Sequence, residues 1–205
     1  MKRSILLIAG ILLSLVTAAQ NVPTKAEDIS PLLIGESVPE VALTNTNGNK
    51  VTLKEVLKQK PTVLVFYRGG WCPYCNRQLS GLGAIADQLV AKGFQIVAVS
   101  PDTPENLQAT IDKNELNYTL LSDSKMEAAR QFGISFKVSQ QTLTKYKDYG
   151  INLTTASGES HNELPVPSVF IVDKEGKIHF EYINPDYSKR ISSELLLAAT
   201  EGLEM

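Results

Sequence analysis

The feature that most constrains the fold is an apolar run that passes, through a short loop, into a helical pattern. Residues 62–67 (TVLVFY) show no alternation of polar and apolar side chains, which is typical of a strand covered on both faces of its sheet. From Pro73 onward, apolar side chains recur at helical spacing, at Leu79, Leu82, Ile85, Ala86, Leu89 and Val90. The segment therefore predicts a strand followed directly by a helix, the repeating unit of an α/β sheet.

The only two cysteines of the chain lie where this loop enters the helix. Cys72 and Cys75 are separated by two residues. A helix N-terminus offers unpaired backbone N–H groups and a partial positive charge, and both favour a thiolate over a thiol. The thiolate is the reactive species, and a second cysteine this close can resolve a bond formed by the first. The pattern predicts a reversible dithiol/disulfide couple.

The cysteine pair has two other interpretations, a permanent disulfide and a zinc site. A permanent disulfide between Cys72 and Cys75 would close so short a loop that it would restrict the unfolded chain little. A zinc site would need two more ligands at suitable spacing, and the two histidines, His161 and His179, do not form such a cluster with the cysteines. The redox interpretation is therefore favoured, and neither a metal nor another cofactor is expected.

Four further residues are candidates for the same site. Arg68 could hold a thiolate or bind a peroxide oxygen, or it could be a surface cation. Trp71 could shield the sulfur from water or pack at the sheet edge. Pro167, directly before an expected core strand, is a candidate for a cis peptide bond beside the cysteines. It would then present the backbone of Val166 to a bound peptide or thiol partner, although a simple strand-entry proline would look the same.

The rest of the chain predicts a single α/β domain over residues 35–205. Alternating apolar residues around the turn at 45–49 predict an N-terminal β-hairpin extension, and Thr52 with Glu55 predicts a helix capping box. Further strands are expected at 95–100, 118–123, 169–173 and 178–182, and further helices at 104–114, 124–132 and 191–201. This order implies a central mixed β-sheet flanked by helices.

One stretch departs from the alternation of strands and helices. Residues 136–150 look weakly helical, and residues 151–163 are polar and loop-like. Together they predict an insertion at about 136–164. Long loops in compact domains are often functional, so the insertion either shapes a substrate or partner surface or is a solvated excursion.

The first residues resemble a targeting segment. Two cations at positions 2 and 3, an apolar run over 5–16 and small residues at 17–19 predict a cleaved signal peptide over 1–19, with a membrane anchor or a buried helix as alternatives. Residues 20–34 are expected to form a flexible lead. A periplasmic or secreted protein, in contact with a membrane only during export, is therefore expected. The net charge of −2 gives no electrostatic case for nucleic acid.

Four segments carry a resemblance to a known family: FYRGGWCPYC at 66–75, VSPD at 99–102, LLSD at 120–123 and VPS at 166–168. Residues 35–200 resemble the thioredoxin-fold peroxiredoxin-like proteins, the alkyl hydroperoxide reductase/thiol-specific antioxidant group, in its atypical Cys-x-x-Cys branch. The resemblance implies a thioredoxin-like fold and antioxidant or thiol-exchange activity.

The order in which the cysteines react stays open at this point. The position at the helix start and the thioredoxin pattern both favour Cys72 as nucleophile, whereas the peroxiredoxin pattern places Cys75 at the peroxide-attacking position. The first functional hypothesis is an exported thiol-dependent peroxidase, recycled by a thiol electron donor such as a thioredoxin-like protein. The second is a thiol–disulfide oxidoreductase acting on protein disulfides or apocytochrome cysteines. The third is a non-catalytic adaptor whose pair is a static clip.

Overall fold

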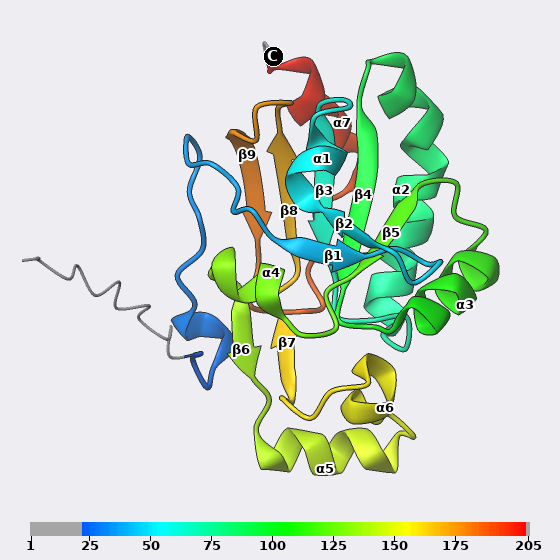
Figure 1. Ribbon diagram of the computed structural model, residues 1–205, viewed down its shortest axis with the longest axis vertical. Coiled ribbons are helices and arrows are strands. Elements are labelled where there is room, and N and C mark those ends of the chain that lie inside the picture. Colours follow the sequence, from blue (N-terminus) through cyan, green and yellow to red (C-terminus); the bar gives the residue numbers. More distant parts are fainter. Residues whose placement is uncertain (1–21, 204–205) are drawn as a thin grey trace, which may run out of the picture.

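The computed structural model describes residues 22–203 and shows a central sheet between helices (Figure 1). The sheet has seven strands in the order β2-β1-β5-β4-β3-β8-β9. Their bounds are β1 Ala42–Thr44, β2 Lys50–Thr52, β3 Thr62–Phe66, β4 Gln95–Ser100, β5 Thr119–Ser122, β8 Ser168–Val172 and β9 Ile178–Ile183. Strands β3, β4 and β5 are parallel, whereas β8 is antiparallel to β3, so the predicted mixed sheet is confirmed. The predicted signal peptide, 1–19, lies outside the described residues.

Helices cover both faces of this sheet, as expected for an α/β domain (Figure 1). One face carries α2 (Pro73–Ala91), α3 (Pro104–Asn114) and α7 (Ser193–Glu201), and the other carries α1 (Leu53–Leu57) and α4 (Glu127–Gln131). Along β3, Val63 and Val65 pack in the core under α2, while Leu64 and Phe66 pack in the core under α1 and α4. Because successive side chains point to opposite faces, both of them covered, the strand is apolar from Val63 to Phe66.

The N-terminal hairpin and its capping box form as predicted. Strand β1 pairs antiparallel with β2, and the Asn45 side chain accepts hydrogen bonds from the N–H groups of Asn47 and Asn49, each at 3.0 Å. Thr52 and Glu55 then cap α1 reciprocally, each side chain bonding to the other's backbone N–H. The hairpin thus extends the sheet beyond β5 and starts the helix that covers it.

The insertion contains more regular structure than its sequence predicts. Strands β6 (Ser135–Lys137) and β7 (Glu163–Pro165) form a separate two-stranded antiparallel sheet. In the chain, α5 (Gln140–Asp148) and α6 (Leu153–Ser157) follow β6 and precede β7. Figure 1 shows these elements beyond one end of the main sheet. Strands of three residues are too short for a visible alternation, and α5 buries no residue and has only Leu143 and Tyr146 as large apolar side chains to mark it.

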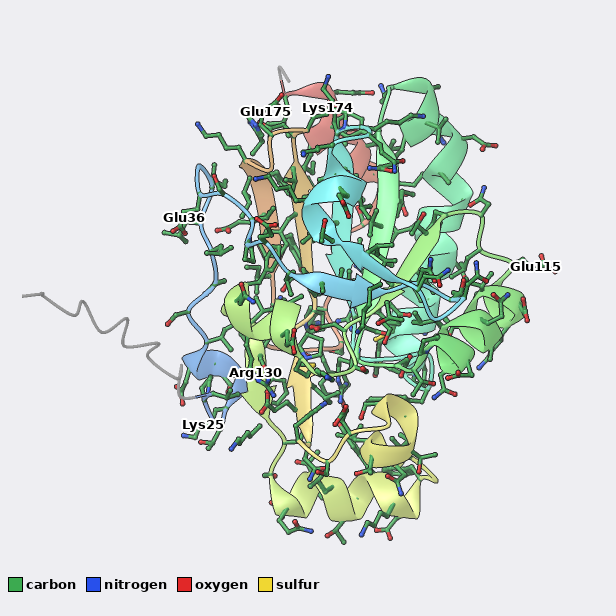
Figure 2. All side chains as sticks on the ribbon, in the orientation of Figure 1. Lys25, Glu36, Glu115, Arg130, Lys174 and Glu175 are labelled. Atoms are coloured by element: carbon green, nitrogen blue, oxygen red, sulfur yellow. The ribbon has the colours of Figure 1, made fainter. Side chains whose placement is uncertain are left out.

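A buried carboxylate ties the insertion to the main domain. Glu163 on β7 accepts hydrogen bonds from Arg130 Nε of α4 at 2.8 Å and from Ser135 Oγ of β6 at 2.9 Å. Figure 2 shows Arg130 where α4 meets this small sheet. His161 supports the same junction, since its Nδ1 accepts from the Glu163 N–H and its Nε2 donates to the Ser124 carbonyl. His161 is therefore a structural residue here.

The described part of the lead is bonded to the domain, which differs from the flexible lead that its composition predicts. The N–H groups of Ser30 and Leu32 donate to the carbonyls of Gly133 and Phe132, and Lys137 donates to Pro23. Contacts made by the backbone leave no pattern in the side chains, so composition does not reveal them. Within residues 22–203, no helix has the length and apolar character needed to cross a bilayer.

The Glu163 junction leads to a prediction about stability. Glu163→Ala removes the carboxylate that Arg130 and Ser135 share, and we expect the free energy of unfolding to fall by about 2 kcal/mol. A fully buried pair would cost more, but a third of the Arg130 side chain is exposed. Urea unfolding followed by circular dichroism measures the change. Glu175→Ala, in an exposed turn well away from Arg130 in Figure 2, is the control, and equal losses in both variants would contradict the prediction.

Candidate active site

The two cysteines lie at the junction between β3 and α2. The strand ends at Phe66, Cys72 is the N-cap of α2, and Pro73 occupies its first turn. Proline suits this position because the N–H it lacks would have no partner inside the helix. Cys75 falls in the first turn of the same helix, so both sulfurs lie near the unpaired N–H groups of its N-terminus.

The loop between strand and helix requires its two glycines. Gly69 has φ of +143°, and a Cβ at this position would lie 2.3 Å from the Trp71 ring nitrogen. A Cβ on Gly70 would lie 2.0 Å from Thr110 Oγ1 on α3. The Gly70 N–H donates to Asp102 Oδ2 at 2.7 Å, which fixes the loop to the end of β4. The position of Cys72 therefore depends on a tightly packed backbone.

The two cysteines are free thiols with opposite titration behaviour. The hydrogen bond from the Cys75 thiol is the main factor that lowers the pKa of Cys72 to about 6. The Cys75 backbone N–H and the charges of Arg68 and Arg190 lower it further, while burial opposes them. Burial raises the pKa of Cys75 well above its ordinary value, and the interaction with Cys72 raises it more. The negative charge of the pair therefore resides on Cys72.

Arg68 is buried at the site and is not a surface cation. Its side chain lies among three aromatic rings, with the guanidinium carbon 4.0 Å from the ring centre of Tyr187, 5.2 Å from that of Trp71 and 5.7 Å from that of Tyr146. Its Nη2 donates to the Tyr146 hydroxyl. Because Tyr146 belongs to α5, the insertion contributes directly to the surroundings of the cysteines.

Trp71 links the cysteine loop to the insertion. Its ring centre lies 5.5 Å from that of Tyr146, and the side chain packs against the small apolar cluster of Val138, Leu153 and Leu164. These are packing contacts with the insertion, and a shielding of the sulfur by Trp71 stays a prediction.

The structure corrects the prediction for Pro167. No cis peptide bond occurs among the described residues, so Pro167 is trans. Val166 is fully buried, its N–H donates to the Ile134 carbonyl at 2.8 Å, and its carbonyl accepts from Ser168 Oγ at 2.8 Å. The Val166 backbone is thus occupied within the chain, because the segment before β6 lies where a docked peptide was expected. Pro167 instead lines a cavity of about 240 Å³ together with Arg68, Tyr146 and Tyr187.

Arg190 is a site residue that sequence reasoning missed. It lies 115 positions after Cys75, just before α7, and its Nη2 is 3.6 Å from Cys75 Sγ. No local motif marks it, because the contact depends on α7 packing against α2. Within residues 22–203, no cluster of three or more potential metal-ligating side chains includes the cysteine pair.

A thioredoxin-like sheet with a dithiol at the start of a helix defines a class of thiol-dependent oxidoreductases. Residues 34–181 match the model of the AhpC/TSA family. The chain therefore belongs to this family, and it is a thiol-dependent oxidoreductase of the peroxiredoxin type.

Two curated relatives and one solved structure illustrate the relationship. The putative peroxiredoxin bcp of Haemophilus influenzae is 35% identical over 106 residues, which are 52% of this chain and 68% of the relative. Peroxiredoxin Bcp of Escherichia coli K12 is 33% identical over 106 residues, which are 52% and 67% of the two chains. Reduced Prx3 from Vibrio vulnificus, solved in complex with H2O2, matches with a TM-score of 0.68 at 21% identity, covering 83% of this chain and 97% of that chain. At that identity the structural match shows the fold alone.

The shared hydrogen bond between the thiols leads to a prediction about their titration. In Cys75→Ser, which keeps a hydroxyl donor, the ultraviolet absorbance of the Cys72 thiolate should rise through a midpoint near pH 6. In Cys75→Ala, which removes the donor, the midpoint should move upward toward the ordinary thiol range of about 8.5. A transition near pH 6 that survives in Cys72→Ser would place the charge on Cys75 and contradict the assignment.

Proposed function

We propose that this protein reduces hydroperoxides, with Cys72 as the attacking thiolate and Cys75 as the resolving thiol. The observation that carries the proposal is the pair itself: free Cys72 and Cys75 occupy the N-cap and the first turn of α2, where the helix N-terminus and the nearby arginines favour a thiolate on Cys72. The names of the peroxiredoxin relatives support the same activity.

The reaction has three steps. The Cys72 thiolate attacks one peroxide oxygen, so that a sulfur–oxygen bond forms, the oxygen–oxygen bond breaks, and the leaving oxygen departs as water or an alcohol after gaining a proton. The resulting sulfenic acid condenses with the Cys75 thiol, giving a disulfide and water. Two equivalents of an external thiol, or one dithiol such as a reduced thioredoxin-like protein, then reduce the disulfide.

Arg68 is suited to the first step. Its guanidinium borders the cavity of about 240 Å³ and has aromatic neighbours, without an acidic side chain bonded to it among the described residues. A cation held in this way stabilises the negative charge that develops on the leaving oxygen. Tyr146 and Tyr187, whose rings lie over Arg68, line the same cavity, while Cys72 and Cys75 are both buried.

The alternative of a protein disulfide as substrate has less support. A bound polypeptide would need free main-chain groups beside the cysteines. The Val166 N–H already donates to the Ile134 carbonyl, and no part of Val166 is exposed. The closed surroundings of Cys72 and Cys75 therefore support a small peroxide as the substrate.

Cysteine variants test the order of the steps. Cys72→Ser should abolish peroxide consumption, because no thiolate remains to attack. Cys75→Ser should consume about one equivalent of peroxide and then stop, with Cys72 held as a sulfenic acid that dimedone traps and mass spectrometry locates. Loss of the first turnover in Cys75→Ser, with its retention in Cys72→Ser, would reverse the assignment. Wild-type protein that consumes no peroxide with any thiol donor would overturn the activity.

The proposed location is the periplasm or the exterior of the cell. It is supported by the cations, the apolar run and the small residues within positions 1–19. Protein recovered from a periplasmic fraction should begin at Gln20 by intact mass and N-terminal sequencing. Recovery only in the cytoplasm, with the mass of the full chain, would contradict export.

A further inference from the structure

An arginine side chain, that of Arg190, lies beside the resolving cysteine, Cys75. Arg190 Nη2 lies 3.6 Å from Cys75 Sγ, and Cys75 is fully buried. The contact joins the first turn of α2 to the segment that leads into α7. In the peroxidase cycle proposed above, Arg190 acts only by helping to lower the pKa of Cys72, and no group is assigned to the activation of Cys75.

The Arg190 guanidinium is held in place by the chain around it. Its Nη1 donates to the Tyr187 carbonyl and, at 2.8 Å, to the Lys189 carbonyl. The turn is itself ordered by Asp186, whose carboxylate accepts from the Ser188 N–H and hydroxyl. The remaining Nε is buried and bonds to no other group among the described residues. The side chain is therefore preorganised toward the sulfur and is not paired with a carboxylate.

We propose that Arg190 activates the resolving thiol, by stabilising the Cys75 thiolate as it attacks the sulfenic acid of Cys72. The inference rests on the proposed peroxidase cycle. It assigns the activation of Cys75, in the second step of that cycle, to Arg190, which lies outside α2.

The electrostatics of the pair change between the resting and oxidised states. In the resting protein burial, together with the interaction with the Cys72 thiolate, raises the pKa of Cys75, so that Cys75 remains a thiol. Once Cys72 is a neutral sulfenic acid, that interaction is gone. Arg190 still lies beside the sulfur and still lowers the pKa of Cys75. The cation therefore acts on Cys75 when Cys75 has to react.

The step balances without an external oxidant. Cys75 loses its proton, the thiolate attacks Cys72 Sγ, and the sulfur–sulfur bond forms as the sulfur–oxygen bond breaks. The departing hydroxide takes up a proton, and water leaves. The two electrons that formed the new bond come from Cys75, and the sulfenic oxygen leaves with its own pair.

The experiment separates the two half-reactions. Reduced protein is mixed with one equivalent of H2O2, samples are quenched over time, and dimedone-trapped sulfenic acid and the Cys72–Cys75 disulfide are counted by mass spectrometry. At about pH 8, where Cys72 stays ionised even if loss of the Arg190 charge raises its pKa somewhat above 6, sulfenic acid in Arg190→Met should form at close to the wild-type rate. The disulfide should then close at least about tenfold more slowly, so that the sulfenic acid accumulates.

Two further variants test whether charge at this position is what matters. Arg190→Lys keeps the charge and should recover part of the lost rate of closure. Lys189→Met, the matched control, removes an exposed cation from the adjacent position and should close the disulfide at the wild-type rate. Closure in Arg190→Lys as slow as in Arg190→Met would indicate a structural role and overturn the inference.

Two other outcomes would overturn the role of Arg190. Wild-type closure rates in Arg190→Met would overturn the role of Arg190 and leave the peroxidase cycle intact. A slower first step in Arg190→Met, with normal closure, would overturn it too, because Arg190 would then serve the attack on peroxide. Failure of the proposed function is distinguishable, since the wild-type protein itself would then form no sulfenic acid.

Discussion

The placement of two free cysteines at the start of α2 is the constraint on which the rest of the site depends. It places the negative charge on Cys72, the N-cap residue, and leaves Cys75 protonated in the first turn. This placement requires the helix to begin where it does, and the loop before it is fixed by the hydrogen bond from the Gly70 N–H to Asp102. A shift of this loop would move both sulfurs relative to every group that surrounds them.

The groups around the pair come from segments far apart in the chain. Arg68 belongs to the loop itself, Tyr146 to the insertion, and Tyr187 and Arg190 to the segment before α7. One guanidinium lies among aromatic rings and the other is held by backbone carbonyls, so neither is bonded to a carboxylate among the described residues. Each cation can therefore act on a sulfur or an oxygen whose charge changes during the reaction.

Much of the fold follows from local patterns. The strand and helix around the cysteines, the N-terminal hairpin and the Thr52–Glu55 cap are all where periodicity and capping chemistry predict them. The trans Pro167 differs from its prediction, because the residues beside it are bonded to a segment that the sequence did not indicate as a partner. The short strands β6 and β7 were not predicted for a related reason. Three residues are too few to show the alternation of polar and apolar side chains, and the pairing of β6 with β7 joins positions far apart in the chain.

The sequence alone determined that Cys72 and Cys75 lie together at a helix start and that Arg68 lies near them. These relations span a few residues and follow from chain connectivity. Only the tertiary structure decided that Tyr146 would pack beside Arg68 and that Arg190 would meet Cys75. Those contacts depend on how α5 and α7 pack against the rest of the domain, and packing is the sum of many weak interactions along the whole chain. No short run of residues encodes that sum.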